Sequence, residues 1–206
     1  SDISVDSPTN NFATLNPLNI KTGNTFTFSE GNLKHAGSNN GQSSSTIETT
    51  TGKYYYEHLT LNTTGHPTVG LINSDVYDKA TDSMGESVGA WSCWTQSGDV
   101  RNNATTGGNT GAFSVGDILN VAYDVDAGKV WFGKNNVWEG SGNPATGANA
   151  TFTNLTGTIA PALIQYAIGC FNFGQDSSFA GNKTAQGNQD SNDIGDFYYA
   201  PPSGYL

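Results

Sequence analysis

Residues 85–89 have the sequence Gly-Glu-Ser-Val-Gly, which matches the G-x-S-x-G pattern of serine hydrolases. In those enzymes the serine lies on a sharp turn between a strand and a helix, and an acid and then a histidine follow it in the chain. Here residues 90–94 have the composition of a strand, and the histidines, His35, His58 and His66, all precede Ser87. Because the order does not suit a catalytic triad, we expect no nucleophile at Ser87.

Acidic residues could also serve metal binding. Residues 124–128, Asp-Val-Asp-Ala-Gly, resemble the start of a calcium loop. An EF-hand loop that begins at Asp124 needs glycine at its sixth position and glutamate at its twelfth. Lys129 and Asn135 occupy those positions, so this segment is predicted to be a hairpin corner. The cysteines and histidines show no zinc-ligand spacing either, and we predict neither a metal nor a cofactor.

Glycoside hydrolysis is the remaining catalytic alternative. It needs two carboxylates held about 5–9 Å apart in a cleft. The few glutamates do not form the paired-acid cluster of sandwich-fold glycanases, and Glu57 lies beside Tyr56 in an expected strand. A structural role for Glu57 is the better interpretation, and the chain is predicted not to be an enzyme.

Aromatic residues in or beside expected loops give the best indication of binding. The rings are Tyr77, Trp94 and Trp138, and their polar neighbours are Asp75 and Asn103. An exposed ring close to amide and carboxyl groups combines apolar stacking with directed hydrogen bonds, which suits sugars or peptide side chains. The alternative is that these rings cap the ends of the core.

Composition narrows the classes of partner. The formal net charge of −10 arises because the chain has only 8 Lys and Arg residues, and these are not clustered. Nucleic acid and anionic membranes are therefore not expected partners. No apolar run reaches the length of about 18 residues that a membrane span needs, so membrane insertion is not expected.

Hydrophobic periodicity indicates short strands throughout. Residues 53–60 alternate, which places Tyr54, Tyr56, His58 and Thr60 on one face. Residues 118–125 and 129–134 form the clearest hairpin, around Gly128. Residues 25–28, 68–72 and 88–94 are further strand candidates, and residues 162–173 are the longest one. Long loops are expected at residues 36–46, 73–89, 97–111, 139–150 and 174–195. This pattern predicts one all-β antiparallel sandwich over residues 1–206.

Cys93 and Cys170 are expected to be buried thiols or, alternatively, a disulfide.

Several segments together resemble the SPRY domain, a concanavalin A-like jelly roll. Residues 116–136 are similar to the family's hairpin, in which a G-D strand leads through a D-x-x-x-G turn to a W-F-x-K-N strand. Residues 52–57 resemble its G-K-x-Y-x-E strand, and residues 69–71 its V-G-L strand. Residues 161–162 and 171–175 resemble its P-A and V-N-F-G ending. The core motifs thus span residues 52–175, with flanking segments at 1–51 and 176–206.

The flanking segments resemble a narrower group. Residues 7–18 and 199–205 look like the edges of SPRY-like modules in bacteriophage structural proteins. Two departures are evident: Gly133 replaces the usual bulky residue of the W-F-x-K-N strand, and residues 176–195 look like an inserted loop.

The resemblance implies a non-catalytic binding protein on the surface of a virion. The expected role is a capsid decoration protein or tail-fibre module that contacts other virion proteins, or a host surface glycan or protein, through its loops. A multicopy or homo-oligomeric state is expected. The alternative is a purely architectural capsid or tail subunit, and a polysaccharide-degrading enzyme is a third hypothesis.

Overall fold

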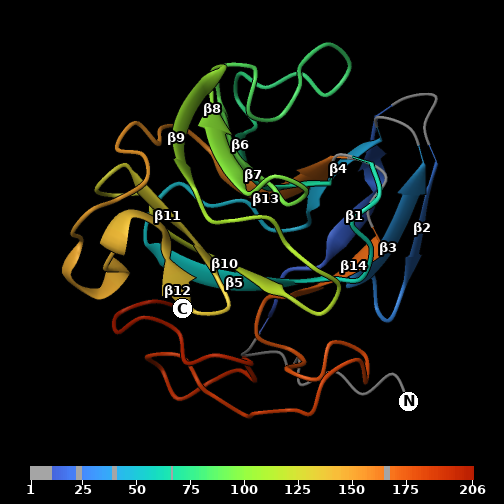
Figure 1. Ribbon diagram of the computed structural model, residues 1–206, viewed down its shortest axis with the longest axis vertical. Coiled ribbons are helices and arrows are strands. Elements are labelled where there is room, and N and C mark those ends of the chain that lie inside the picture. Colours follow the sequence, from blue (N-terminus) through green and yellow to red (C-terminus); the bar gives the residue numbers. More distant parts are fainter. Residues whose placement is uncertain (1–10, 22–24, 39–40, 66, 165–167) are drawn as a thin grey trace.

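Two seven-stranded antiparallel sheets face each other in the computed structural model, which describes residues 11–21, 25–38, 41–65, 67–164 and 168–206 (Figure 1). The first sheet has the order β1 (Leu15–Ile20), β4 (Gln42–Ser45), β13 (Ile159–Ile164), β6 (Thr68–Asn73), β7 (Ala90–Trp94), β8 (Asp99–Asn102) and β9 (Thr105–Asn109). The second has the order β12 (Val137–Trp138), β11 (Lys129–Lys134), β10 (Ile118–Asp124), β5 (Lys53–Thr60), β14 (Ile168–Asn172), β3 (Lys34–Ser38) and β2 (Thr25–Ser29). The predicted all-β antiparallel sandwich is confirmed.

Outside the strands, the described residues contain two short 3-10 helices, η1 (Glu139–Ser141) and η2 (Pro144–Thr146). Among those residues, no helix has the length and apolar character that crossing a membrane requires. His66, and residues 7–10 of the phage-like amino-terminal segment, lie outside the described residues.

The β10–β11 hairpin forms as the sequence predicts. Tyr123 pairs with Val130, and Asp124 pairs with Lys129. At the corner the Asp124 carboxylate accepts a hydrogen bond from the Ala127 amide at 2.9 Å, and Gly128 has a φ of 67°. Asp124 is therefore occupied with holding a turn, which agrees with the interpretation of this segment as a hairpin corner.

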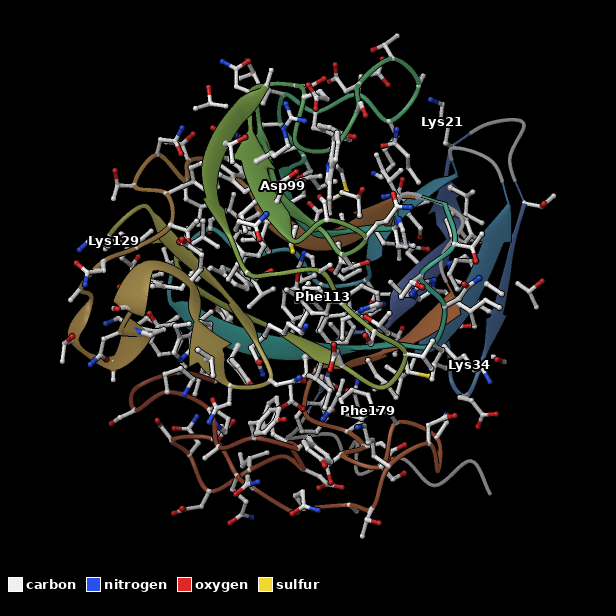
Figure 2. All side chains as sticks on the ribbon, in the orientation of Figure 1. Lys21, Lys34, Asp99, Phe113, Lys129 and Phe179 are labelled. Atoms are coloured by element: carbon white, nitrogen blue, oxygen red, sulfur yellow. The ribbon has the colours of Figure 1, made fainter. Side chains whose placement is uncertain are left out.

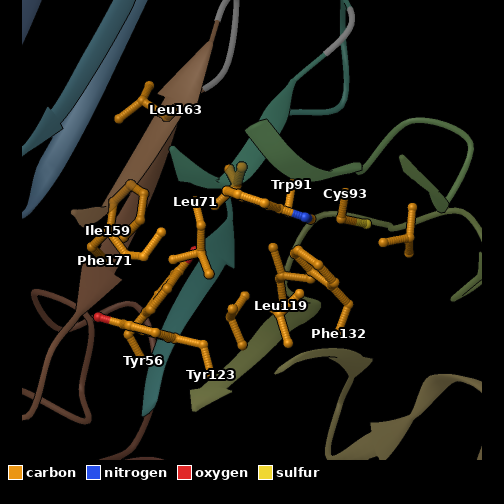
Figure 3. Close-up of a cluster of buried hydrophobic side chains, with 14 of the residues drawn as sticks. Tyr56, Leu71, Trp91, Cys93, Leu119, Tyr123, Phe132, Ile159, Leu163 and Phe171 are labelled. Carbon is orange, nitrogen blue, oxygen red and sulfur yellow. The ribbon is translucent and has the colours of Figure 1, made fainter. Parts of the chain in front are cut away.

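The core lies between the sheets and consists largely of rings. Strand alternation sends Trp91 and Cys93 of the first sheet inward to meet Tyr56 and Phe132 of the second. Figure 3 shows Tyr56 and Tyr123 at one end of this cluster and Cys93 at the other. Aromatic side chains bury a large apolar area each, so a chain with few aliphatic residues still obtains a continuous core.

The carboxyl-terminal segment, residues 173–206, covers the outer face of the second sheet (Figure 1). Phe197 and Tyr205 pack on Tyr55, Ala122 and Trp131 in one outer cluster. Phe179 of the same segment joins a second outer cluster and lies just outside this sheet (Figure 2). The central strands of the second sheet, β5 and β10, are thus buried on both faces, whereas the edge strand β2 is partly exposed.

Three predictions about elements need correction. Residues 162–173 do not form one strand, because β13 pairs with β4 and β6 in the first sheet while β14 pairs with β3 and β5 in the second. The expected loops at 36–46 and 97–111 contain β3, β4, β8 and β9. The apolar run at 162–173 correctly indicates buried strands. It does not indicate that the chain leaves the first sheet and enters the second, because both strands are largely apolar. In the two expected loops, β4 and β9 escaped prediction because they are rich in serine, threonine and glycine, which give little alternation between apolar and polar residues.

The two cysteines are buried and free. Cys93 faces the central core, whereas Cys170 belongs to the outer cluster with Leu59, Ile118 and Phe179. Because the two thiols lie on different sides of the second sheet, they do not form a disulfide.

Candidate binding site

A pocket of about 310 Å³ opens at the end of the sandwich where β5 begins and β10 ends. Residues before β1, the connection after β4, strands of both sheets and the carboxyl-terminal segment all contribute to it. Its lining consists of Asn11, Phe12, Ala13, Ile47, Thr49, Tyr54, Tyr55, Tyr56, Tyr123, Pro161, Phe173, Asp190, Asn192, Ile194 and Leu206. A concave, mainly apolar site with several aromatic rings and a few polar groups is typical of ligand recognition.

Aromatic rings form the inner wall of the pocket. The Tyr54 and Tyr123 ring centroids are 5.4 Å apart, and those of Tyr56 and Phe173 are 5.6 Å apart. The Tyr56 hydroxyl donates a hydrogen bond to the Gly70 carbonyl at 2.8 Å, which fixes this ring against the first sheet. Burial raises the pKa of both Tyr56 and Tyr123 above the ordinary value, so both hydroxyls stay protonated.

Polar and exposed apolar groups share the rim. Asp190 is the one charged side chain among the described lining residues. Its Oδ1 atom accepts hydrogen bonds from the backbone amides of Asn192 at 2.7 Å and Ile194 at 3.1 Å. Ile47 and Leu206 remain 38% and 41% exposed. The rim therefore offers a carboxylate close to apolar surface.

Glu57 holds the carboxyl-terminal segment that completes the pocket. Its carboxylate is fully buried and accepts four hydrogen bonds. Oε1 accepts from the Tyr55 hydroxyl at 2.9 Å and the Tyr199 amide at 2.7 Å, and Oε2 accepts from the Tyr198 amide at 2.9 Å and the Asn172 side chain at 3.1 Å. Burial raises the pKa of Glu57 to about 7, against the effect of these donors. This arrangement agrees with the prediction of a structural acid.

A second attachment lies at the end of the chain. The Tyr55 amide donates to the Leu206 carbonyl at 2.7 Å, and the Leu206 amide donates to the Lys53 carbonyl at 3.1 Å. Leu206 therefore takes the position beside β5 that β14, which ends at Asn172, leaves free. With Glu57, this pairing fixes the wall that carries Asp190.

The structure buries the ring of Tyr77, which sequence analysis placed among the exposed binding residues. The side chain is 6% exposed and packs with Met84, Ile72 and Ala90. Its hydroxyl donates to Gln42 Oε1 at 2.6 Å. The expectation of an exposed ring is corrected, because loop 74–89 folds Tyr77 onto the outer face of the first sheet.

Trp94 is partly buried on the outer face of the first sheet. The Arg101 guanidinium lies 4.5 Å from its ring centroid, and Arg101 Nη1 is 2.9 Å from Glu86 Oε1. Asn103 lies nearby at the β8–β9 turn with a φ of 48°, where the next amide, that of Ala104, donates to the Gly85 carbonyl. One face of Trp94 is thus already used within the domain.

Asp75 and Trp138 lie elsewhere. Asp75 Oδ2 accepts a hydrogen bond from the Thr158 amide at 2.8 Å, so it joins two loops. Trp138 belongs to the second sheet, where it packs edge-on to Tyr55 with centroids 6.4 Å apart. A Cβ on Gly133 would lie 3.0 Å from the Trp138 ring, which explains why a bulky residue is missing there. The five residues do not form one site, and their role in binding stays a prediction.

The hydrolase motif has no catalytic surroundings in the described structure. The Ser87 hydroxyl accepts a hydrogen bond from the Ser83 amide at 3.1 Å within loop 74–89. His35 and His58 pair inside the second sheet, with their Nε2 atoms 3.0 Å apart. Ser87 thus lies in a loop that joins two strands of the first sheet, whereas these histidines lie in the second sheet.

Sequence analysis did not identify the pocket. Its alternating pattern did place Tyr54 and Tyr56 on one face, and both rings line the pocket. Asp190 carries no local signal, because it lies in the expected loop 174–195 and reaches the site only through the Glu57 contacts. The segment that looks inserted is therefore one of the walls.

The family model of the SPRY domain matches residues 53–176. The chain therefore belongs to the SPRY family, whose domains are generally non-catalytic and serve protein–protein interaction.

Solved structures agree with this fold. The SPRY domain of human HERC1 superposes with a TM-score of 0.60 at 17% identity, over 76% of this chain and 96% of that one. Stonustoxin matches with a TM-score of 0.56 at 20% identity, over 78% of this chain and 26% of that one. No curated protein matches the sequence.

Proposed function

We propose that this domain is a non-catalytic recognition module on the surface of a bacteriophage particle, as a capsid decoration protein or part of a tail fibre. The support for the phage setting is the likeness of residues 7–18 and 199–205 to the edges of SPRY-like modules in phage structural proteins. The formal net charge of −10 suits a surface protein present in many copies, because like charge opposes nonspecific association.

The observation that carries the binding role is the aromatic pocket. Tyr54, Tyr123 and Phe173 provide ring surface there, and Asp190 provides a directed polar contact. Protein recognition commonly depends on a few residues that enter such pockets. The partner is a protein of the particle or of the host surface, and part of it enters the pocket.

A purely architectural role is the second candidate, and Leu18 favours it. This side chain is 96% exposed on β1, an edge strand of the first sheet. An exposed edge strand can pair with another chain, so identical copies could assemble there. In that case the pocket would be unnecessary for function.

Binding of fluorescently labelled domain to candidate host cells, followed by flow cytometry, tests the recognition role. We expect saturable binding that a Tyr54→Leu variant reduces at least tenfold, while Leu18→Ser binds as the wild type does. Soluble envelope glycans serve as competitors and distinguish a glycan from a protein partner. If cells bind no multimerised domain and Leu18→Ser abolishes self-association, the architectural role replaces the recognition role.

A further inference from the structure

We infer that the pocket receives a Lys or Arg side chain from the partner protein. The inference rests on the proposed function, because it names the chemistry of the group that enters the pocket. Three properties of the pocket carry it: its aromatic rings, the carboxylate of Asp190 and its size.

The ring faces suit a cation. A Lys or Arg group within about 6 Å of an aromatic centroid is attracted to the negative face of the ring. This domain already uses such contacts, with Arg101 over Trp94 at 4.5 Å and Lys134 over Phe113 at 5.2 Å.

Within the described chain, neither Tyr54 nor Tyr123 receives a cation, because the cation–ring contacts involve Tyr205, Trp94, Phe113 and Tyr198. None of the eight Lys and Arg residues is among the described residues that line the pocket. Lys21, Lys34 and Lys129 lie at the periphery of the domain in Figure 2. The ring of the partly buried Tyr54 is therefore available to a cation from a partner, and the buried Tyr123 ring packs behind it at 5.4 Å.

The charge of the rim has the matching sign. Asp190 uses Oδ1 to hold its own turn, whereas Oδ2 accepts no hydrogen bond from the described residues. With the described residues, the Tyr54 hydroxyl and the Asn192 side chain likewise make no hydrogen bond. A guanidinium or ammonium group supplies several donors for these acceptors. The net charge of −10 further favours a basic partner.

The size of the pocket suits a single side chain. At about 310 Å³, the pocket is at the lower end of the range of ligand sites, which is ~300–1,000 Å³. The exposed Ile47 and Leu206 at the rim can contact the methylene stem or a neighbouring apolar residue, while the charged end meets Asp190.

A peptide titration tests this inference directly. The probes are acetylated and amidated pentapeptides Gly-Gly-X-Gly-Gly in which X is Lys, Arg, Leu or Glu, added to ¹⁵N-labelled wild-type domain. We expect the Lys and Arg peptides to shift the amide resonances of Tyr54, Tyr123 and Ile194 in a saturable way. The Leu and Glu peptides should bind at least tenfold more weakly, and added salt should weaken the Lys and Arg peptides.

Two charge-removing variants separate local from general electrostatics. Asp190→Asn keeps the Oδ1 acceptor of the turn but removes the rim charge, and we expect it to weaken the Lys and Arg peptides at least tenfold. Asp193→Asn is the matched control, because Asp193 is exposed, is not among the pocket-lining residues and has a φ of 58° that asparagine tolerates. It should change binding less than twofold.

Tyr54→Leu gives a second, charge-neutral variant, and it should weaken the same peptides while the melting temperature reports that the fold is kept. Equal binding of the Leu or Glu peptides, shifts that map outside the pocket, or equal effects of Asp190→Asn and Asp193→Asn would each overturn the inference. If the domain binds its cells through Tyr54 while the Lys and Arg peptides fail, the inference is wrong and the proposed function stands. If cell binding is absent as well, the proposed function fails.

Discussion

The carboxylate of Glu57 accepts a hydrogen bond of 2.7 Å from the backbone amide of Tyr199, a residue 142 positions later in the chain. This contact joins a central strand of the second sheet to the segment that covers its outer face. Because the same segment carries Asp190, the buried acid also determines the shape of the pocket. The stability of the domain and the geometry of its candidate site therefore depend on one side chain.

Replacement of Glu57 by glutamine should destabilise the domain. A glutamine amide presents an N–H group where Glu57 accepts from the Tyr198 or Tyr199 amide, so at least one buried donor loses its acceptor. The cost of such a group is about 1–3 kcal/mol, and we expect the free energy of unfolding at pH 5 to fall by this amount in urea titrations. Glu30→Gln is the control, because Glu30 is exposed, and it should stay within about 0.5 kcal/mol of the wild type. Equal effects of the two variants would contradict the structural role of Glu57.

The difference between wild type and Glu57→Gln should depend on pH. Burial raises the pKa of Glu57 from 4.5 to about 7, so between these values the folded state binds a proton that the unfolded state has released. This contribution to stability is complete below pH 4.5 and is lost as the pH rises through 7. The advantage of the wild type over the glutamine variant should thus shrink by up to about 3 kcal/mol between pH 4.5 and 8. An advantage that grows with pH would mean that the hydrogen bonds outweigh burial and that the carboxylate is ionised in the fold.

A second pH dependence comes from His58. Burial, and next the charge of His35, lower the pKa of His58 well below 6.5. Below pH 6.5 the unfolded chain therefore binds a proton that the folded chain does not, and stability falls as the solution becomes more acidic. In His58→Gln this group no longer titrates, so the loss of unfolding free energy between pH 7 and pH 5 should be smaller than in the wild type. Identical pH profiles would show that His58 does not control acid unfolding.

Strand-level features of this protein are predictable from local sequence, and the site is not. The hairpin around Gly128 and the alternation of Tyr54 and Tyr56 appear in the residues themselves, because a pleated strand repeats every two positions. The passage between β13 and β14 leaves no such mark, because both strands are buried. Asp190 reaches the pocket through Glu57, and a contact between residues so far apart in the chain has no periodic signature. Tyr77 shows the reverse difficulty, since its neighbours look like a loop while its ring joins a buried cluster.

The close approach of β6 and β7 provides a last test of the fold. A Cβ built on Gly70 would lie 2.0 Å from the Trp91 carbonyl oxygen, which is backbone and cannot rotate away. The Gly70 carbonyl also accepts the hydrogen bond of the Tyr56 hydroxyl, so a shift of β6 would disturb the inner wall of the pocket. We expect Gly70→Ala to reduce the free energy of unfolding by about 3 kcal/mol or more, measured by urea unfolding. A variant as stable as the wild type would show that β6 and β7 separate more easily than this packing implies. The NMR resonances of Tyr56 would then report whether the inner wall of the pocket moves with β6.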